Sequence, residues 1–516
     1  MDTELTATLY LPNISYSLLA IIIAMLITLH YYIETRHVIR LSLKLPHPPR
    51  IPIIGHLLIT LKINSEDALI CFVKLCAKYG SVLSLFYGTR AFIFLTDPQD
   101  IEVILNNPEH IDKPAEYRCF KPWLGDSILF NNGAKWLKER QTILATFRMQ
   151  ILRKCVPLFY ENSQDLVRRL AQNINERFNC HEHLSVATFN MLVEAEMGIS
   201  RKKIEDISFN YTTAVIKLSE IVHKRQIDMS LQSDLLFRFS KFAKLQQELL
   251  HTVHSAARLV IQEKWKDIEE KQFKNKHQIE AENLTENAEN GINTINYKMH
   301  YARDDLDDIE NVDMSEKKQL HFLEMLMDMR KNGEMTDKEI LNFVNSILFA
   351  AHETIAAASS FVLCTLGCLP EIQARVHDEL DSIFYDSDRE CTFQDTINMK
   401  YLDRVILETL RLFPVVPLFG RKLNKDARIG NYVLPKDAII LIFPVVSHRT
   451  EKYYPNPLVF NPDNFLPDNM RQRNSYAYIP FSAGPRSCLG RKYSMLTLKV
   501  LLSTLLRNYR ITSDVS

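Results

Sequence analysis

The feature that most constrains this chain is a long apolar run near its start. Residues 14–33 read ISYSLLAIIIAMLITLHYYI and contain no Asp, Glu, Lys or Arg. A helix of this length spans about 30 Å, the thickness of a bilayer's hydrocarbon core. A cleaved signal peptide is the alternative, but it needs a basic start, and residues 1–13 carry Asp2 and Glu4 without a basic residue. We therefore expect a single transmembrane anchor that is retained.

The segment after the run sets the expected orientation. Residues 34–55 are rich in proline and basic, with the cations Arg36, Arg40, Lys44 and Arg50. Under the positive-inside rule, residues 1–13 are lumenal and the body of the protein faces the cytosol. Proline fixes φ and cannot continue a helix, so we expect a stiff linker that orients the body on the membrane.

Charge and cysteine content exclude several classes of protein. Lys+Arg and Asp+Glu both number 62, so no overall field favours nucleic acid. The 9 cysteines are odd in number and scattered, unlike a secreted disulfide framework, which predicts a reducing compartment. Cys71 with Cys76, and Cys364 with Cys368, have helical spacing in apolar segments and are expected to be buried.

Local patterns predict a mainly α body of residues 56–516 with small β-sheets. Residues 81–95 read as two strands around a Gly88–Thr89 turn, and 438–443 as a buried strand. Asp97-Pro98 is a helix start, and the capping box at Thr336–Glu339 opens an apolar helix that extends to about residue 369. Residues 270–316 are polar and charged, which predicts a solvated loop insertion.

The most specific pattern is FSAGPRSCLG at residues 481–490. A single cysteine, Cys488, cannot hold zinc or an iron–sulfur cluster alone, but it can be the proximal ligand of haem. A helical run follows it, and helix-terminal amides lower a thiol's pKa. Gly484 permits a tight turn, Gly490 permits close approach of a flat macrocycle, and Arg486 can neutralise a propionate. Taken singly, each residue has an ordinary structural explanation.

This segment, from Phe481 to Gly490, resembles the cysteine-ligand loop of cytochrome P450 enzymes, and other motifs agree with it in order and spacing. Glu408-Thr-Leu-Arg411 matches the family's E-x-x-R, which implies a buried structural pair behind the haem. The family's third partner is usually an arginine in P-x-R-F, where this chain has Asn464. The resemblance therefore implies a less charged and weaker network.

The resemblance also implies which cations face the propionates. Trp136 and Arg140 match a W-x-x-x-R helix, whose two side chains share one face. Arg421, seven residues after Pro414, matches another propionate-binding position. Each of these charges alone would more simply be solvated, but together with Arg486 they supply the cations that a buried dicarboxylate needs.

The apolar helix carries the motif of a proton relay in this family, a small residue, any residue, an acid and a threonine. Here it reads Ala351-His352-Glu353-Thr354, with Glu in place of the commoner Asp. The resemblance implies that Glu353 and Thr354 deliver the protons that dioxygen cleavage consumes. Outside that context, Thr354 would bond to its own helix.

The sequences YAYIPFSAGPRSCLG, FLEMLMDM and PWLG are similar to those of the insect-like members of cytochrome P450 family 4. Many members of that group carry a glutamate that esterifies a haem methyl. Ala350 occupies the position here, which implies that haem b is held without a covalent bond apart from the thiolate–iron bond.

The implied activity is insertion of one oxygen atom from dioxygen into an apolar small molecule, such as a fatty acid, a terpenoid hormone or a xenobiotic. Electrons would come from NADPH through membrane-bound NADPH–cytochrome P450 reductase, with cytochrome b5 as an optional second donor, at the endoplasmic reticulum membrane. Family positions place the substrate against residues 114–130, 350–354 and 415–418.

Two rival functions remain open at the level of sequence. A reductase-independent peroxide isomerase would need no relay such as Glu353-Thr354. A catalytically impaired haem carrier is the other rival, and Asn464 favours it. Family members usually continue for roughly thirty residues as a β-hairpin, so we also expect that this chain is an incomplete version or one of reduced stability.

Overall fold

The computed structural model describes residues 3–61, 63–282, 321–385 and 387–513. It is mainly α-helical with two small β-sheets, as the sequence predicts. Its first helices are α1 (Thr3–Thr35), α2 (His37–Ser42), α3 (Leu57–Leu61), α4 (Ala68–Tyr79), α5 (Pro98–Leu105), α6 (Lys121–Leu124), α7 (Gly133–Leu144), α8 (Met149–Leu152), α9 (Val156–Leu170), α10 (Cys180–Leu192) and α11 (Glu205–Ile227). The later ones are α12 (Met229–Gln232), α13 (Asp234–Phe237), α14 (Phe242–Glu282), α15 (Phe322–Lys331), α16 (Asp337–Cys368), α17 (Pro370–Phe384), α18 (Phe393–Asn398), α19 (Lys400–Leu412), α20 (Pro444–Ser447), α21 (Pro467–Gln472) and α22 (Arg491–Asn508).

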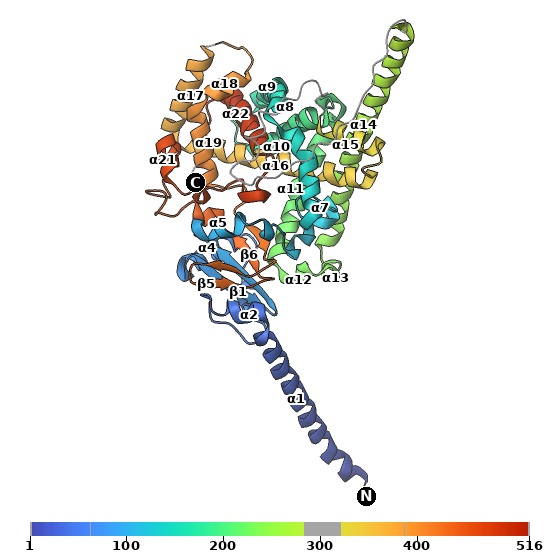
Figure 1. Ribbon diagram of the computed structural model, residues 1–516, viewed down its shortest axis with the longest axis vertical. Coiled ribbons are helices and arrows are strands. Elements are labelled where there is room, and N and C mark those ends of the chain that lie inside the picture. Colours follow the sequence, from blue (N-terminus) through green and yellow to red (C-terminus); the bar gives the residue numbers. More distant parts are fainter. Residues whose placement is uncertain (1–2, 62, 283–320, 386, 514–516) are drawn as a thin grey trace.

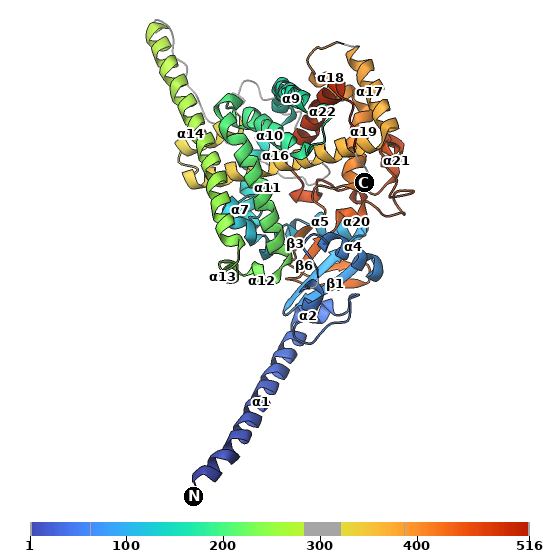
Figure 2. The ribbon, with the colours of Figure 1, turned by 180° about the vertical axis from the view of Figure 1, so that it is seen from behind.

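Helix α1 projects away from the body of the protein (Figures 1 and 2). Two helices in the described part of the chain are long and apolar enough to cross a membrane, Tyr16–Thr35 within α1 and the whole of α16. The α16 window is half buried, as in a core helix, whereas only 6% of the α1 window is buried. The body therefore leaves most of the apolar side chains of Tyr16–Thr35 uncovered, and this segment has the length to cross a bilayer.

The expected linker, residues 34–55, is in part folded onto the body. It contains α2, whose Val38 and Ile39 are buried in the same apolar cluster as Leu45 and the strands. Arg50 forms a two-pronged ion pair with Glu34 at 2.5 and 2.9 Å. The segment after α1 thus contains a short packed helix, which the sequence did not predict.

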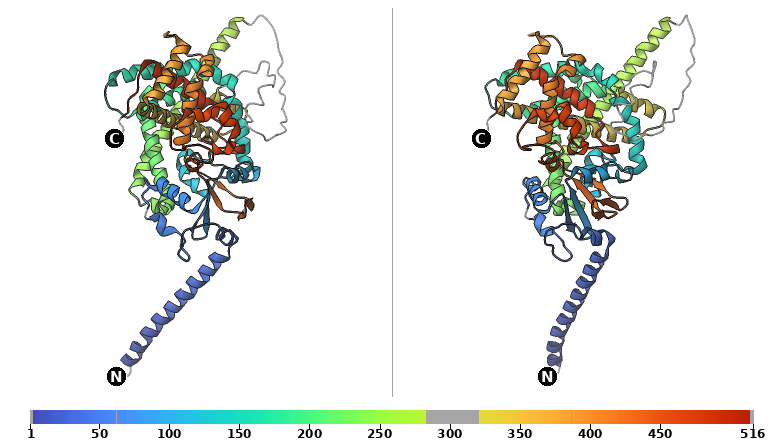
Figure 3. Two further views of the ribbon diagram at one scale, coloured as in Figure 1. Left: turned by 90° about the vertical axis from the view of Figure 1, so that its left-hand side faces the viewer. Right: turned by 60° about the vertical axis from the view of Figure 1, so that its left-hand side comes forward.

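The larger sheet has the order β1-β2-β6-β3. Strands β1 (Val82–Tyr87) and β2 (Arg90–Leu95) form the predicted antiparallel pair, β6 (Ile439–Ile442) joins β2 in parallel, and β3 (Phe419–Lys422) is antiparallel to β6. A second sheet pairs β4 (Ala427–Ile429) with β5 (Tyr432–Leu434). The strands lie between α1 and the helical body (Figure 3). In β3, Arg421 pairs with Ile440, which fixes this arginine beside the core.

Helix α16 runs through the middle of the helical body (Figure 1). It starts as predicted, with the Thr336 side chain accepting from the Glu339 amide and the Glu339 carboxylate accepting from the Thr336 amide. Helices α10, α14, α19 and α22 pack against it, and its apolar residues are buried in the main core cluster. Because several helices hold it, α16 is a rigid platform for the side chains it carries.

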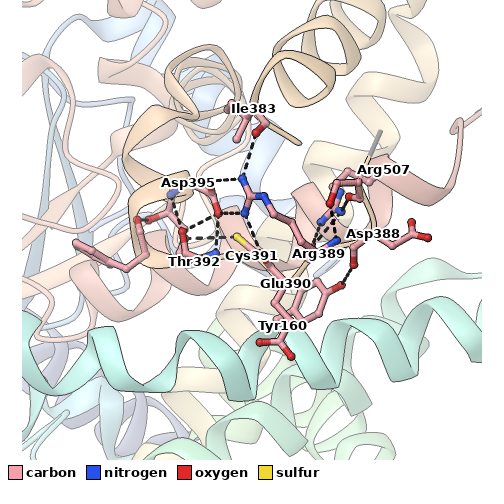
Figure 4. A network of polar contacts seen from close by, with 12 residues as sticks. Tyr160, Ile383, Asp388, Arg389, Glu390, Cys391, Thr392, Asp395 and Arg507 are labelled. Atoms are coloured by element: carbon pink, nitrogen blue, oxygen red, sulfur yellow. Dashed lines mark hydrogen bonds and ion pairs between the residues drawn. The ribbon is translucent and has the colours of Figure 1, made fainter. Parts of the chain in front are cut away.

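A polar network fixes the connection from α17 to α18 (Figure 4). Arg389 forms a two-pronged ion pair with Asp395 at 2.7 and 2.8 Å. Arg507 of α22 donates to the carbonyl oxygens of Ser387 and Arg389 at 2.6 and 3.2 Å. The network ties this connection to α22, the helix that follows Cys488.

Two local expectations are wrong. Residues 270–282 continue helix α14 and are not a loop, because Lys, Glu, Gln and Ala favour helix and neither Gly nor Pro interrupts them; the rest of the predicted loop, from residue 283, lies outside the described residues. Cys364 and Cys368, expected to be buried, are exposed, while Cys76 is buried and Cys71 is partly buried. Helical spacing in an apolar segment therefore did not show which face of α16 reaches solvent.

Candidate active site

Cys488 lies in the loop that leads into α22. Its amide donates to the Phe481 carbonyl oxygen at 2.9 Å, which closes the loop. Its side chain is accessible at its own surface, although it lies deep among the atoms of the body. Burial by the surrounding protein raises the pKa of the Cys488 thiol, although the Gly490 amide and the charges of Arg140 and Arg491 act in the opposite direction. The predicted lowering by helix-terminal amides is thus present but outweighed by desolvation.

The two glycines of the loop have different constraints. Gly484 has φ of +69°, and a Cβ atom there would overlap the Leu105 carbonyl oxygen, so this position requires glycine. Gly490 has φ of −85°, and a Cβ atom there would meet only Cys488 Sγ and Ser494 Oγ, both at 3.9 Å. The protein itself therefore leaves room for a side chain at residue 490. A ligand that lies close to the Cys488 thiol would explain why this residue is glycine.

Helix α7 places Trp136 and Arg140 against this loop. Trp136 is 3% exposed, and the guanidinium carbon of Arg486 lies 4.8 Å from its ring centroid. Arg140 donates to the Ser487 carbonyl oxygen at 2.8 Å. The two α7 residues therefore share one face of the helix, as their spacing predicts, and that face contacts the residue before Cys488.

Arg421 and Arg486 are buried cations, with 2% and 9% of their surface exposed. Burial lowers the pKa of Arg421 to about 10 and, together with the Arg421 charge, that of Arg486 to about 9. Burial and both arginines also hold the pKa of Lys113 well below its usual value. Three cations thus lie close enough to repel one another.

No carboxylate of the described residues lies within ion-pair distance of these three cations. Asp112 partly offsets the Arg486 charge, but its oxygens already accept from the Gly133 amide and the Asn424 side chain at 3.0 and 2.9 Å. Arg486 donates to backbone carbonyls, including that of Asn131 at 2.8 Å. Buried cations without a counter-ion are costly, so this cluster is suited to a ligand with negative charges.

Glu408 and Arg411 of α19 form a two-pronged pair, both bonds being 2.7 Å long, and neither residue is exposed. Arg411 also donates to the carbonyl oxygens of His448, Pro457 and Val459 at 3.0, 2.7 and 3.2 Å. Asn464 is 6% exposed and donates to Glu408 at 3.2 Å. Asn464 is thus a neutral third member of the network.

Glu353 and Thr354 are adjacent on α16, but their side chains bond elsewhere. Thr354 Oγ1 donates to the Ala350 carbonyl oxygen at 2.8 Å, the bond expected of a threonine in a helix. Glu353 Oε1 lies 3.2 Å from His181 Nε2, and Ser185 of α10 donates to its second oxygen at 3.5 Å. No described hydrogen bond joins the Glu353 and Thr354 side chains to each other.

Sequence reasoning missed Lys113 and His181. Lys113 belongs to no motif, and only the folded chain brings it to Arg421 and Arg486. His181 lies 172 residues before Glu353, and no local pattern connects the two. A lone histidine or lysine between motifs gives no signal that a single sequence could show.

Comparison with known proteins agrees with this arrangement. The family model described as Cytochrome P450 matches residues 45–515. Cytochrome P450 4g15 of Drosophila melanogaster is 38% identical over 520 residues, covering 95% of this chain and 90% of that protein. Cytochrome P450 4c21 of Blattella germanica is 33% identical, covering 91% and 88%, and human Cytochrome P450 4V2 is 31% identical, covering 90% and 83%. The chain belongs to the cytochrome P450 family, is similar to its family 4 members, and is a monooxygenase.

Proposed function

We propose that this chain is a haem-thiolate monooxygenase in which the Cys488 thiolate ligates the haem iron. The observation that carries the proposal is the accessible Cys488 side chain near a cluster of cations, Lys113, Arg421 and Arg486, that no carboxylate of the described residues pairs with. A haem needs one soft axial ligand and cations for its two propionates, and both are present. When bound, the haem supplies the activation of dioxygen.

The protein's residues have distinct roles in this proposal. Arg421, Arg486 and Lys113 would hold the propionates together with Arg140, and Trp136 would shield that contact from water. Gly490 would allow the macrocycle to lie against the thiolate. Glu408, Arg411 and Asn464 would keep the segment behind the loop in place. The net reaction takes up substrate, dioxygen, two electrons and two protons, and releases the hydroxylated product and water, so residues that move protons limit its efficiency.

The substrate side of the site is aromatic and apolar. Trp123 and Phe349 lie with ring centroids 4.6 Å apart, and Phe120 stacks on Phe130 at 4.9 Å. These residues join the 114–130 segment to α16, where family positions place the substrate. An apolar compound is the expected substrate, because such walls offer contact area and few hydrogen bonds. Fatty acids, terpenoid hormones and xenobiotics are the classes to screen.

We further propose that α1 anchors the protein in the endoplasmic reticulum membrane, with residues 1–13 lumenal and the body cytosolic. An apolar helix that the body leaves uncovered supports this. NADPH–cytochrome P450 reductase would then supply electrons from the same membrane surface, with cytochrome b5 as an optional second donor.

The test of the proposal is the variant Cys488→Ser in the full chain. We expect wild type to bind haem and to show the ferrous–CO absorption of a thiolate-ligated haem, and the variant to lose it. Turnover with NADPH should require the reductase, which separates a monooxygenase from a peroxide isomerase or a haem carrier. An unchanged CO spectrum in the variant would refute the role of Cys488.

A further inference from the structure

Glu353 has two histidine neighbours in opposite states. His352 Nε2 lies 3.7 Å from Glu353 Oε2, but this ring is fully buried and its Nε2 has no hydrogen-bond partner among the residues that the structure describes. Burial lowers the pKa of His352, which keeps the ring neutral. His181, on α10, is 24% exposed and contacts the other carboxylate oxygen at 3.2 Å. Of the two, only His181 touches both solvent and the acid.

The contacts around His181 are those that an imidazolium can make with both of its ring nitrogens. Nε2 faces the Glu353 carboxylate, which accepts only, and Nδ1 faces Ser360 Oγ at 3.2 Å. The Ser360 hydroxyl donates its own proton to the Ala356 carbonyl oxygen at 2.7 Å, so toward His181 it is an acceptor. An imidazolium has an N–H donor on each ring nitrogen, so it can donate to both the Glu353 carboxylate and the Ser360 hydroxyl oxygen.

We propose that His181 is the residue that returns protons from solvent to Glu353 during turnover, an inference that rests on the proposed monooxygenase function. The Nε2 proton moves to the ionised Glu353 carboxylate, which passes it on toward the site, and the neutral ring then takes a proton from water. The two protons consumed per turnover thus enter along the α10–α16 contact. No other reactant is needed.

The charges around His181 favour an imidazolium–carboxylate pair at rest, in which His181 holds the proton that it delivers during turnover. The hydrogen bond to Glu353 raises the pKa of His181, and Glu182 adds to the effect. Burial raises the pKa of Glu353, but the hydrogen bonds from His181 and Ser185 and the charge of His181 outweigh it, so the pKa is lowered. The other titratable groups here include Tyr211, a buried hydroxyl whose pKa burial and the Glu353 charge raise, and the pair Cys180 and Cys364, whose mutual hydrogen bond lowers the pKa of Cys364 to about 6. Cys364→Ser is therefore a second control.

The sign of the pH dependence follows from these shifts. Below its raised pKa, His181 is an imidazolium and can donate; above that pKa it is neutral and delivers protons less readily. Coupling, the product formed per NADPH consumed, should therefore fall as pH rises through the His181 pKa. Peroxide release should rise over the same interval.

The experiment compares His181→Gln with His183→Gln in the reductase-supported, full-length enzyme. Glutamine keeps an N–H donor toward Glu353 but cannot give up a proton, whereas His183 lies two residues further along α10, edge to face with Phe178 at a centroid distance of 5.3 Å. For His181→Gln we expect coupling to fall about tenfold, less than the hundredfold or more typical of a general acid, because Glu353 is itself 19% exposed to water. Its pH dependence should flatten and its solvent isotope effect should grow. His183→Gln and Cys364→Ser should match wild type.

Two further measurements keep the outcome decisive. Turnover supported by peroxide should be unchanged in His181→Gln, because peroxide brings its own protons, and so should the ferrous–CO spectrum. If the wild-type enzyme itself shows neither peroxide-supported turnover nor this spectrum, the monooxygenase proposal is wrong. In a Glu353→Gln background, the His181 substitution should have no further effect on coupling. The role of His181 would be overturned if His181→Gln kept the coupling of the wild type and its fall with rising pH. It would also be overturned if the effects of the His181 and Glu353 substitutions on coupling added up in the double variant.

Discussion

Removing Arg411 should destabilise the body more than any exposed ion pair could. Arg411 is wholly buried and donates two bonds to Glu408 and one each to the carbonyl oxygens of His448, Pro457 and Val459. In Arg411→Ala, the Glu408 carboxylate keeps only the Asn461 amide at 2.8 Å and the Asn464 side chain at 3.2 Å. An uncompensated buried charge of this kind costs about 3–5 kcal/mol.

The matched control is Arg404→Ala on the same helix. Arg404 pairs with Asp463 at 2.7 Å, but their side chains are 19% and 43% exposed. Its loss should cost about 0.2–1 kcal/mol. The comparison removes the effects of helix propensity and side-chain length, because both substitutions replace an arginine of α19 by alanine.

The assay is urea unfolding of the haem-loaded protein in detergent, followed by far-ultraviolet circular dichroism and by the haem absorption band. We expect Arg411→Ala to lose haem and helix at clearly lower urea than Arg404→Ala. The double variant Glu408→Gln with Arg411→Met should recover part of the loss, because no buried charge remains. Equal midpoints for the two arginine variants would refute this reasoning.

Four shorter predictions concern the site. Thr354→Ala should lower product per NADPH by about tenfold and raise peroxide release, because the hydroxyl beside Glu353 is lost; unchanged coupling would mean that water alone completes the path. Acid–organic extraction should free all the haem, since Ala350 has no carboxyl group, and haem retained on the denatured chain would contradict this. Gly484→Ala should reduce haem incorporation, because a Cβ atom would overlap the Leu105 carbonyl oxygen. Gly490→Ala should keep the fold but weaken haem binding. If Gly490→Ala binds haem as tightly as the wild type, haem does not require a glycine at residue 490.

The sequence predicts those parts of the fold whose causes are local. The Thr336 capping box and the apolar period after it are complete within α16, and the β1–β2 pair needs only two strands and the turn at Gly88. Residues 270–282 were mispredicted because their charge suggested solvent, whereas charged residues of this kind also favour helix. Where a segment carries both signals, composition alone does not decide between them.

The site is predictable only where a motif carries it. The loop at Cys488 and the pair Glu408–Arg411 are short patterns, so a single sequence reveals them. The partner of Glu353 is different, because His181 reaches it through the packing of α10 on α16. Neither residue's neighbours along the chain predict that contact, and the same is true of Lys113.

The cluster of Lys113, Arg421 and Arg486 shows how contacts between distant segments of the chain affect the stability of the whole protein. Arg421 comes from a strand, Arg486 from the loop before Cys488 and Lys113 from the segment before α6. The Arg421 charge lowers the pKa of Arg486, and both arginines lower the pKa of Lys113, so the three cations destabilise one another. A chain selected for stability alone would not gather three cations with so little compensation. A ligand with two carboxylates changes the sign of the electrostatic energy at this cluster, because the repulsion among the cations of the free protein is replaced by their attraction to the ligand. Binding then adds RT ln(1 + [L]/Kd) to the free energy of unfolding, so the same residues that weaken the free chain select for the haem-loaded state.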